Sequence, residues 1–441
     1  MRNLKAIRKG ALGAAAVFMS LGALPAHAKV AGGYETNLMS VYKHLHANPE
    51  LSMMEVETAK YLAGQLSAMG FEVTEGFGKT GVVAIYKNGP GKTVMVRADM
   101  DALPVKEDTG LPFASQVVTT DQHGKEWPAM HACGHDIHMT VAMGTAQEML
   151  ANKDLWSGTL MVILQPGEEV SQGAIAMLEE GLFTKFPRPD YNLALHANSH
   201  LAAGKVGVVP GYALANVDSV DVTVRGIGGH GAYPNTAKDP IVLAAQLVLA
   251  FQTIVSREIA PQEPAVVTVG SIHGGTKHNI IGEEVKLQLT LRSYTQEVRE
   301  QTIAAIRRIS KGMGQAAGLP DDKLPIVEIK NEYTPAAFNN PELANRAMGI
   351  MGDIIGEQNV LTLKPVMGGE DFGRYGQVEP KIPSLIYWLG AASPKEMKAA
   401  ERDGTTMPSL HSPTFKPDAR AAIPVGVKTM TGTAIALFNQ E

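Results

Sequence analysis

The chain contains two kinds of predicted β-strand, and each kind occupies its own part of the sequence. From residue 29 to about residue 210 the apolar runs are short and continuous, as in TVMVRA at 93–98 and TLMVIL at 159–164. Continuous apolar strands are typical of a mostly parallel sheet that helices cover on both faces. From Asn216 the strands alternate apolar and polar residues, as in VDSVDVTVRG, which indicates antiparallel strands with one face in solvent. The sequence therefore predicts an α/β domain joined to a domain of another type.

The domain of the second type is predicted to be an insertion. From residue 218 the order is strand, helix, strand, strand, helix, strand, with the later elements at 240–258, 265–272, 285–292, 296–317 and 325–331. That order is the ferredoxin-like βαββαβ unit. After about residue 334 the pattern returns to helix and buried strand, with SLIYWL at 384–389. We therefore predict an α/β domain of residues 29–214 plus 335–441, with an inserted α+β domain at 215–334.

The first residues have the pattern of a secretory signal. MRNLKAIRKG is strongly basic, an apolar run follows at 11–24, and AHA at 26–28 forms a small-x-small cleavage site. We expect residues 1–28 to be removed as a signal peptide, and the mature protein to be periplasmic or secreted without a membrane anchor, since no later segment looks apolar enough to span a bilayer. Loss of this basic segment makes the formal net charge of −5 more negative, which argues against nucleic acid as a partner.

The single cysteine, Cys133, lies in the histidine-rich run MHACGHDIH at 130–138. A lone thiol cannot form an internal disulfide, and outside the cytoplasm it is open to oxidation unless something holds it. A metal ion would hold it by binding the thiolate. The alternative is a nucleophilic cysteine with His135 or His138 as its base, but it gives the acidic pair Glu168 and Glu169 no role.

Reactive side chains follow the predicted parallel strands where these end. They are Asp99 and Asp101 after 93–98, Glu168 and Glu169 after 159–164, His196 after 192–195, and His411 in the long loop after 384–389. Singly, each could be a turn residue, a structural histidine or a helix cap. Because the carboxyl ends of parallel strands share one edge of a sheet, we expect these side chains to converge with Cys133 and His135. Such ligands suit zinc, manganese, cobalt or nickel, and they exceed one tetrahedral site, which indicates two adjacent divalent ions.

The adjacent glutamates Glu168 and Glu169 suit a division of labour. One carboxylate can bind metal while its neighbour accepts a proton from an attacking water and later gives it to the leaving group. Metal ions and a base together indicate hydrolysis of an acyl bond.

Motifs spread over nearly the whole mature chain resemble those of the M20 metallopeptidase family, in the same order. They are RADMDALP (97–104), MHACGHDIH (130–138), QPGEE (165–169), LALHA (193–197), GGHGAYP (228–234), HNIIG (278–282), GGEDF (368–372) and LHSPTF (410–415). Within that family the chain resembles the aminoacylase, auxin-conjugate amidohydrolase and hippurate hydrolase branch. The resemblance implies a di-metal α/β catalytic domain with an inserted lid domain that also dimerises. It also implies cleavage of an amide between an acyl group and an amino acid.

The resemblance implies roles for individual residues. The metal ligands would be Cys133, His135, Glu169, His196 and His411, with Cys133 where much of the wider family has a bridging aspartate, and Glu168 would be the general base. Asp101 matches an aspartate that elsewhere supports a metal-bound histidine two residues earlier. Because Asp99 occupies that earlier position here, Asp101 is expected at most behind the ligands. From the residues themselves, Asp136 and His138 are expected to orient neighbouring ligands or to pack and cap. Glu370 and Asp371 are expected to line the pocket or to cap the following helix, of which the cap is favoured.

Three residues of the inserted domain complete the implied site. His230 would reach across a dimer to the partner's active site and stabilise the oxyanion of the reaction. Asn279 and Arg292 would hold the substrate carboxylate, which an arginine fork matches in shape. Without the resemblance, His230 reads as a turn residue between glycines and Arg292 as a solvated strand end.

The sequence therefore predicts a dimeric, metal-dependent amidohydrolase acting on small N-acyl amino acids. Alternatives on the same scaffold are a dipeptidase or carboxypeptidase and an N-carbamoyl-amino-acid hydrolase. A periplasmic metal- or peptide-binding protein is the non-enzymatic alternative, against which the intact glutamate pair argues. The acyl group cannot be read from the sequence, because its pocket depends on loops such as 111–128.

Overall fold

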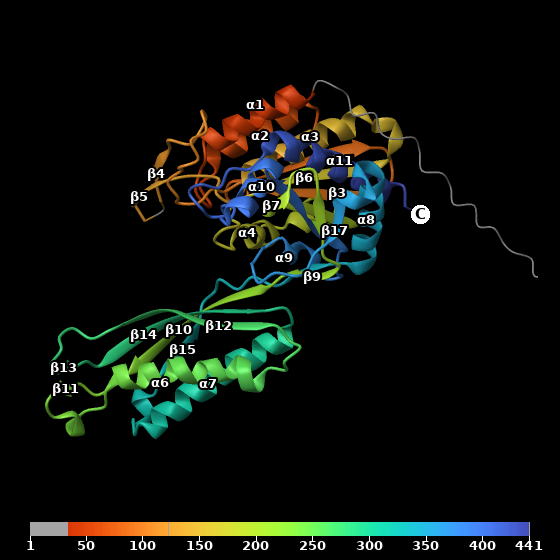
Figure 1. The fold of residues 1–441 in the computed structure, drawn as a ribbon. Helices are drawn as coiled ribbons and strands as arrows, with labels where there is room; N and C mark the ends of the chain where they lie inside the picture. Colours follow the sequence, from red (N-terminus) through yellow and green to blue (C-terminus); the bar gives the residue numbers. More distant parts are fainter. Residues whose placement is uncertain (1–33, 122, 441) are drawn as a thin grey trace, which may run out of the picture.

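The computed structural model describes residues 34–121 and 123–440, which form two lobes (Figure 1). The predicted signal peptide, residues 1–28, lies outside the described residues. One lobe is built on an eight-stranded sheet and the other on a four-stranded sheet. The predicted fold class, α/β with a large and mostly parallel sheet, is confirmed.

Parallel strands form the centre of the eight-stranded sheet. The neighbours β6 (Gly158–Gln165), β3 (Thr93–Asp99), β7 (Tyr191–Ala202) and β18 (Ser384–Ala392) all run in parallel. Antiparallel β2 (Gly81–Asn88) and β1 (Glu72–Phe77) extend the sheet beyond β6, and β8 (Val206–Val208) and β17 (Val360–Thr362) extend it beyond β18. The parallel order brings the carboxyl ends of β6, β3, β7 and β18 to one edge.

Helices cover both faces of this sheet, which explains the continuous apolar runs. Along β3, Val94 and Val96 enter one hydrophobic core and Met95 enters the core on the opposite face. The first core is formed with α1 (Tyr34–Ala47), α2 (Val56–Ala68), α3 (His135–Ala151), α8 (Pro341–Ile355) and α11 (Ala419–Phe438). The second is formed with α4 (Gly173–Glu179), α5 (Leu182–Lys185) and α9 (Gly373–Gly376). A strand buried on both faces is mostly apolar, so few polar side chains occur along it before it ends.

The second lobe is an antiparallel sheet with two helices packed on it. Its strand order is β12-β14-β10-β15, and its elements are β10 (Asn216–Arg225), α6 (Pro240–Thr253), β12 (Ala265–Gly274), β14 (Glu284–Ser293), α7 (Gln296–Ala316) and β15 (Ile326–Ile329). Buried residues alternate strictly along β10. A short pair, β11 (Gly229–His230) with β13 (Ile280–Ile281), lies at the end of this lobe away from the connection to the large sheet (Figure 1).

Short strand pairs complete the described fold. β9 (Gly211–Leu214) pairs with β16 (Ala337–Asn339) where the chain enters and leaves the second lobe, and β4 (Val118–Thr120) pairs with β5 (Glu126–Pro128) within the loop that follows β3. The segment after β18 contains α10 (Pro394–Asp403), although a continuous loop was expected there. Ser393 caps this helix and Pro394 occupies its first turn, which is a local helix start that the sequence analysis missed.

The expectation that no segment after the signal is apolar enough to cross a membrane was wrong by length and composition. Among the described residues, Pro240–Glu258 and Ala419–Phe438 meet that criterion. The second is α11, which packs in the core of the large sheet. The first packs one side on the second lobe and leaves Ile241, Val242 and Leu249 exposed.

Candidate metal centre

The edge formed by the parallel strands collects the predicted site residues of the large lobe. Asp99 ends β3, and Glu168 and Glu169 follow β6 by a few residues. His196 lies within β7, because this strand continues to Ala202 and is longer than the sequence indicated. Cys133 precedes α3 and His135 begins it, whereas His411 comes from the loop after α10.

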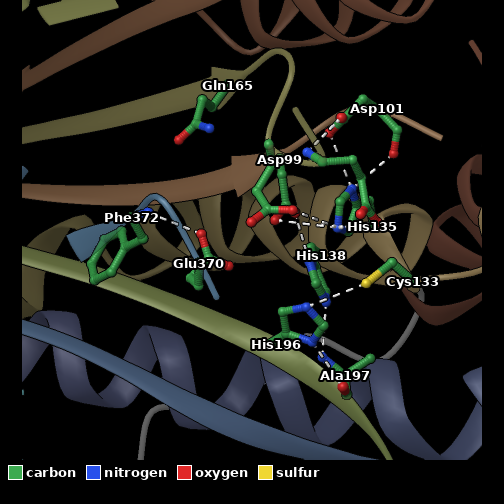
Figure 2. Close-up of polar contacts among 12 residues, drawn as sticks. Asp99, Asp101, Cys133, His135, His138, Gln165, His196, Ala197, Glu370 and Phe372 are labelled. Atoms are coloured by element: carbon green, nitrogen blue, oxygen red, sulfur yellow. Dashed lines mark hydrogen bonds and ion pairs between the residues drawn. The ribbon is translucent and has the colours of Figure 1, made fainter. Parts of the chain in front are cut away.

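Cys133 lies at the centre of two groups of potential ligands. Its Sγ is 3.6 Å from Nε2 of His196 (Figure 2). The same Sγ is 3.2 Å from Nε2 of His411. One group consists of Cys133, His135 and His196, and the other of Cys133, Glu169 and His411, with the ligand atoms of each group within 4.8 Å of one another. Both groups use the same thiol. This geometry suits two neighbouring cations with Cys133 between them.

The backbone ties the three ligand-bearing segments together. Gly134 has a left-handed φ of 84°, and a Cβ there would stand 2.9 Å from the Cβ of Ala197, so glycine permits the close approach to β7. His411 also has a left-handed φ, 65°, and its N–H donates to the carbonyl of Ala132 at 2.8 Å. A histidine held in this sparsely populated region is a typical feature of functional sites.

Hydrogen bonds fix the ring orientation of two histidines. Nδ1 of His135 donates to the carbonyl of Asp101 at 2.8 Å, and Nδ1 of His196 donates to the carbonyl of Ala197 at 2.8 Å. Each ring therefore presents Nε2 to the cluster, as metal-bound histidines do. Nε2 of His135 and Oε1 of Glu169 are buried and lack a hydrogen-bond partner. Buried polar atoms left without partners are costly, and a divalent cation would satisfy both.

Asp101 lies behind these ligands. Its Oδ2 accepts hydrogen bonds from the backbone N–H of Glu169 at 2.9 Å and from the hydroxyl of Ser52 at 2.6 Å. Its Oδ1 is 3.3 Å from Nδ1 of His135. Asp101 thus contacts one ligand from each of the two groups.

The electrostatics of the cluster also fit cations. Burial raises the pKa of the Cys133 thiol well above its ordinary value, and the carboxylates of Glu169 and Glu168 raise it further. Burial also raises the pKa of Glu168, with Glu370 and Glu169 adding to the effect. A divalent cation would reverse this balance, because it stabilises a thiolate and carboxylates directly. The donor set therefore fits divalent metal ions.

A buried ionic network around Arg97 lies next to the candidate ligands. Arg97 donates to Asp99 at 2.7 Å, to Glu370 at 2.9 Å and to Asp371 at 3.1 Å. Asp99 in turn accepts from Nδ1 of His138 at 2.6 Å. Removing one partner from such a buried network typically costs about 3–5 kcal/mol. The sequence analysis did not single out Arg97, although an arginine inside an otherwise apolar strand was the available signal.

His138 and the acidic pair after β17 have structural contacts in this network. Nε2 of His138 accepts from the N–H of Ala197 at 2.8 Å, so both ring nitrogens are bonded and neither is free for a metal. Glu370 bonds the start of α9, because its Oε1 accepts from the N–H of Phe372 at 2.9 Å, whereas the side chain of Asp371 accepts from the N–H of Ala174 in α4 at 3.0 Å. Both carboxylates also accept from Arg97, whose buried guanidinium stabilises their charges. The carboxylates of Glu370, Asp371 and Glu168 lie within 4.8 Å of one another.

Within a single chain, the three predicted site residues of the second lobe do not lie together. His230 and Asn279 belong to the β11–β13 end, whereas Arg292 lies near the end of β14 next to the large lobe. The ten residues of β14 span roughly 30 Å, at about 3.4 Å per residue. Asn279 and Arg292 of the same chain therefore cannot hold one small carboxylate. A Cβ placed on Gly369 would be 3.2 Å from Nη1 of Arg292, which puts this guanidinium beside the loop of Glu370.

A parallel sheet with a thiol, imidazoles and carboxylates at one edge, and the partly buried Glu168 beside them, has the groups of a metal-dependent hydrolase. The sequence pattern of Peptidase family M20/M25/M40 matches residues 95–433. The chain therefore belongs to this family, as its motifs indicated, and it is a metallo-amidohydrolase.

Named relatives agree on amide hydrolysis and differ in substrate. The chain is 37% identical over 363 residues to thermostable carboxypeptidase 2 of Saccharolobus solfataricus, covering 81% of this chain and 87% of that one. It is 35% identical over 394 residues (88% and 96%) to N-acetyldiaminopimelate deacetylase of Streptococcus sanguinis. It is 39% identical over 337 residues (76% and 84%) to hippurate hydrolase of Campylobacter jejuni. Among solved structures it is similar to a dinuclear metal-binding M20 peptidase of Bacillus subtilis, with a TM-score of 0.74, 28% identity, and coverage of 92% and 99%.

Substitution of Cys133 tests its position between the two ligand groups. We expect Cys133→Ala to weaken divalent metal binding by at least about 10-fold, because both groups lose a ligand. Cys133→Asp should retain most of the binding, since a carboxylate can contact two cations. Isothermal titration calorimetry of metal-free protein measures both. Wild-type metal affinity in Cys133→Ala would contradict the geometry and revive the nucleophile alternative.

Proposed function

We propose that this amidohydrolase cleaves N-acyl amino acids into an acyl acid and a free amino acid. The observation that carries the proposal is Arg292, whose guanidinium lies beside the loop of Glu370 with no carboxylate paired to it among the described residues. Burial lowers its pKa, so a substrate carboxylate there would gain a strong, partly desolvated ion pair. Relatives named N-acetyldiaminopimelate deacetylase and hippurate hydrolase support an acylated amino acid as substrate.

Glu168 suits the role of general base in this reaction. Divalent ions held by Cys133, His135, Glu169, His196 and His411 would lower the pKa of water and polarise the substrate carbonyl. Glu168 is next to the candidate ligand Glu169 in the chain, and its Oε2 is 4.0 Å from Nε2 of the candidate ligand His135. Its carboxylate accepts the proton as water attacks the amide carbonyl. The same group then donates that proton to the nitrogen of the leaving amino acid.

His230 suits oxyanion stabilisation from a second copy of the chain. Its Nδ1 accepts from the N–H of Ala232 at 3.0 Å, which leaves Nε2–H as a donor. The ring is exposed at the tip of the second lobe, away from the metal centre of its own chain. The exposed apolar side chains of α6 and the unpaired edge of β12 offer a surface on which two lobes could associate. This supports a homodimer in which each tip completes the partner's site.

A carboxypeptidase or dipeptidase is the second candidate, and the relative named thermostable carboxypeptidase 2 favours it. Its chemistry is the same, because a peptide is also an acylated amino acid with a free carboxylate. An N-carbamoyl-amino-acid hydrolase would use the same groups as well. The basic and apolar N-terminal segment supports a periplasmic or secreted location.

A panel of substrates separates these activities. We expect N-acetyl, N-benzoyl, indoleacetyl or long-chain acyl amino acids to give higher kcat/KM than dipeptides or N-carbamoyl amino acids, in the presence of zinc, manganese, cobalt or nickel. Converting the substrate carboxylate to an amide should raise KM, because Arg292 then has no anion to bind. Product release measured by chromatography follows both effects. Preference for dipeptides would favour the peptidase, and indifference to the carboxylate would remove Arg292 from substrate binding.

A further inference from the structure

The connection between α1 and α2 contacts the loops that carry candidate metal ligands. Residues 48–55 form this connection, and they contact both the segment after β3 and the segment after β6. The carbonyl of Glu50 accepts from the N–H of Ala102 at 2.7 Å. The hydroxyl of Ser52 donates to Asp101, which itself accepts from the N–H of Glu169.

Glu55 ends this connection, and its carboxylate is directed at the loop of the glutamate pair. Oε1 accepts from the N–H of Gly167 at 2.8 Å and from the N–H of Met53 at 2.7 Å, and Oε2 accepts from the hydroxyl of Thr80 at 2.5 Å. Gly167 immediately precedes Glu168. Although Glu55 is the residue before α2, its side chain makes no capping bond to that helix. Its carboxylate oxygens accept from Gly167, Met53 and Thr80 instead.

The environment of Glu55 is unusual for a carboxylate with a purely structural role. The side chain is 0% exposed, and no cation pairs with it among the residues that the structure describes. Burial and, to a smaller extent, the charge of the nearby Asp101 raise the pKa of Glu55 to about 7. Burying a carboxylate without a cation is costly, so the donors that it meets must be held in place firmly.

Gly167 needs such a partner because its backbone conformation is restricted. Its φ is 53°, in the left-handed region, and a Cβ there would lie 2.4 Å from Sδ of Met53. Met53 belongs to the same connection as Glu55 and also has a positive φ, 63°. The connection therefore both fills the space beneath Gly167 and bonds its N–H. These contacts fix the direction in which the chain leaves β6 toward Glu168 and Glu169.

We propose that Glu55 is a positioning residue for the metal centre: by accepting the N–H of Gly167, it holds the loop that carries Glu168 and Glu169 against Asp101. The inference rests on the proposed function only in naming Glu168 as the base. The role of Glu55 is to supply hydrogen-bond acceptors. Gln can replace it, because an amide oxygen can accept from Gly167 and Met53 while the amide nitrogen donates to the oxygen of Thr80.

The chain offers a matched control in the neighbouring turn. The carboxylate of Glu180 accepts from the N–H of Gly78 at 2.8 Å, and Gly78 also has a left-handed φ, 64°. This bond joins the same two groups, a glutamate carboxylate and the N–H of a left-handed glycine, although Glu180 is exposed and its Oε1 lies 3.4 Å from Nζ of Lys185. It lies away from the ligand groups, so its loss reports what breaking such a bond does by itself.

The test compares Glu55→Leu, Glu55→Gln and Glu180→Leu. In Glu55→Leu we expect faster amide hydrogen exchange in residues 166–172, metal affinity lower by about 10- to 100-fold, and a similar loss in kcat with little change in KM. Glu55→Gln should restore all three measurements, and Glu180→Leu should leave metal affinity and kcat unchanged.

Folded Glu55→Leu protein with wild-type exchange and metal affinity would overturn the proposal, as would an equal loss in Glu55→Gln. If Glu55→Leu does not fold, Thr80→Val decides, because it removes one donor to Glu55: exchange in 166–172 must rise, and an unchanged rate refutes the role. Exchange and metal affinity need no turnover. A wild-type protein inactive on every acylated amino acid would therefore sink the proposed function without deciding the role of Glu55.

Discussion

Glu168→Gln protein should bind divalent metal as tightly as wild type and lose about 10²- to 10⁴-fold in kcat, the usual contribution of a general base. The substitution keeps the size of the side chain and removes its ability to accept and return a proton. Glu168 lies between the candidate metal ligands and the buried carboxylates of Glu370 and Asp371. A neutral amide should be tolerated there, since it relieves repulsion among carboxylates.

A second glutamate pair in the chain provides the control for this variant. Glu179 and Glu180 lie at the end of α4, and Glu180 is exposed. Glu180→Gln should therefore have wild-type kcat and metal affinity. Steady-state kinetics and metal titration on both variants give the comparison. Residual activity in Glu168→Gln above about a tenth of wild type would exceed what loss of a base allows and would assign that role elsewhere.

The sequence could predict which side chains gather at this edge of the large sheet, because the apolar pattern that marks each strand is local. Continuous apolar runs mark strands buried on both faces, so the first polar residues after them, such as Asp99 and Glu168, must lie at the edge of the sheet. The strands of the lobe inserted after β9 could be predicted as antiparallel because apolar and polar residues alternate along them. The helix α10 was missed because most of its residues are charged and none of them is buried, so few apolar residues mark it in the sequence.

The residues that support the centre could not be predicted in the same way. Arg97, Glu55 and His138 owe their roles to contacts across long sequence separations, such as the pairing of Arg97 with Glu370. A buried arginine or glutamate is visible in the sequence only as a polar residue in an apolar stretch, and its partner is not visible at all. Their contacts depend on tertiary packing, which no periodicity records.

The division of the lid residues between two ends of the second lobe also has a physical reason. β14 is ten residues long and spans roughly 30 Å, so a residue before its start and a residue near its end cannot meet in one chain. Arg292 lies beside the large lobe of its own chain, whereas His230 and Asn279 lie at the remote tip. If all three serve one substrate, two chains must contribute to each site.

Complementation between two inactive variants tests this arrangement. His230→Ala should lower kcat by about 10²- to 10³-fold, because the oxyanion loses a hydrogen-bond donor. Glu168→Gln should lose activity because it lacks the general base, and it keeps His230 at the tip of the second lobe. In a mixed dimer, the site with an intact Glu168 receives His230 from the Glu168→Gln chain, so it contains every required group.

Mixing the two variants after dissociation and reassociation should therefore restore about a quarter of wild-type activity, since half of the dimers are mixed and each holds one complete site. Mixing Glu168→Gln with itself provides the baseline. If His230 acted within its own chain, the mixed dimers would contain no complete site and the mixture would remain inactive. Recovery depends on exchange of subunits, so it should also fall when exposed Leu249 and Ile241 of α6 are replaced by charged residues, because those changes disfavour the interface that the exposed apolar face offers.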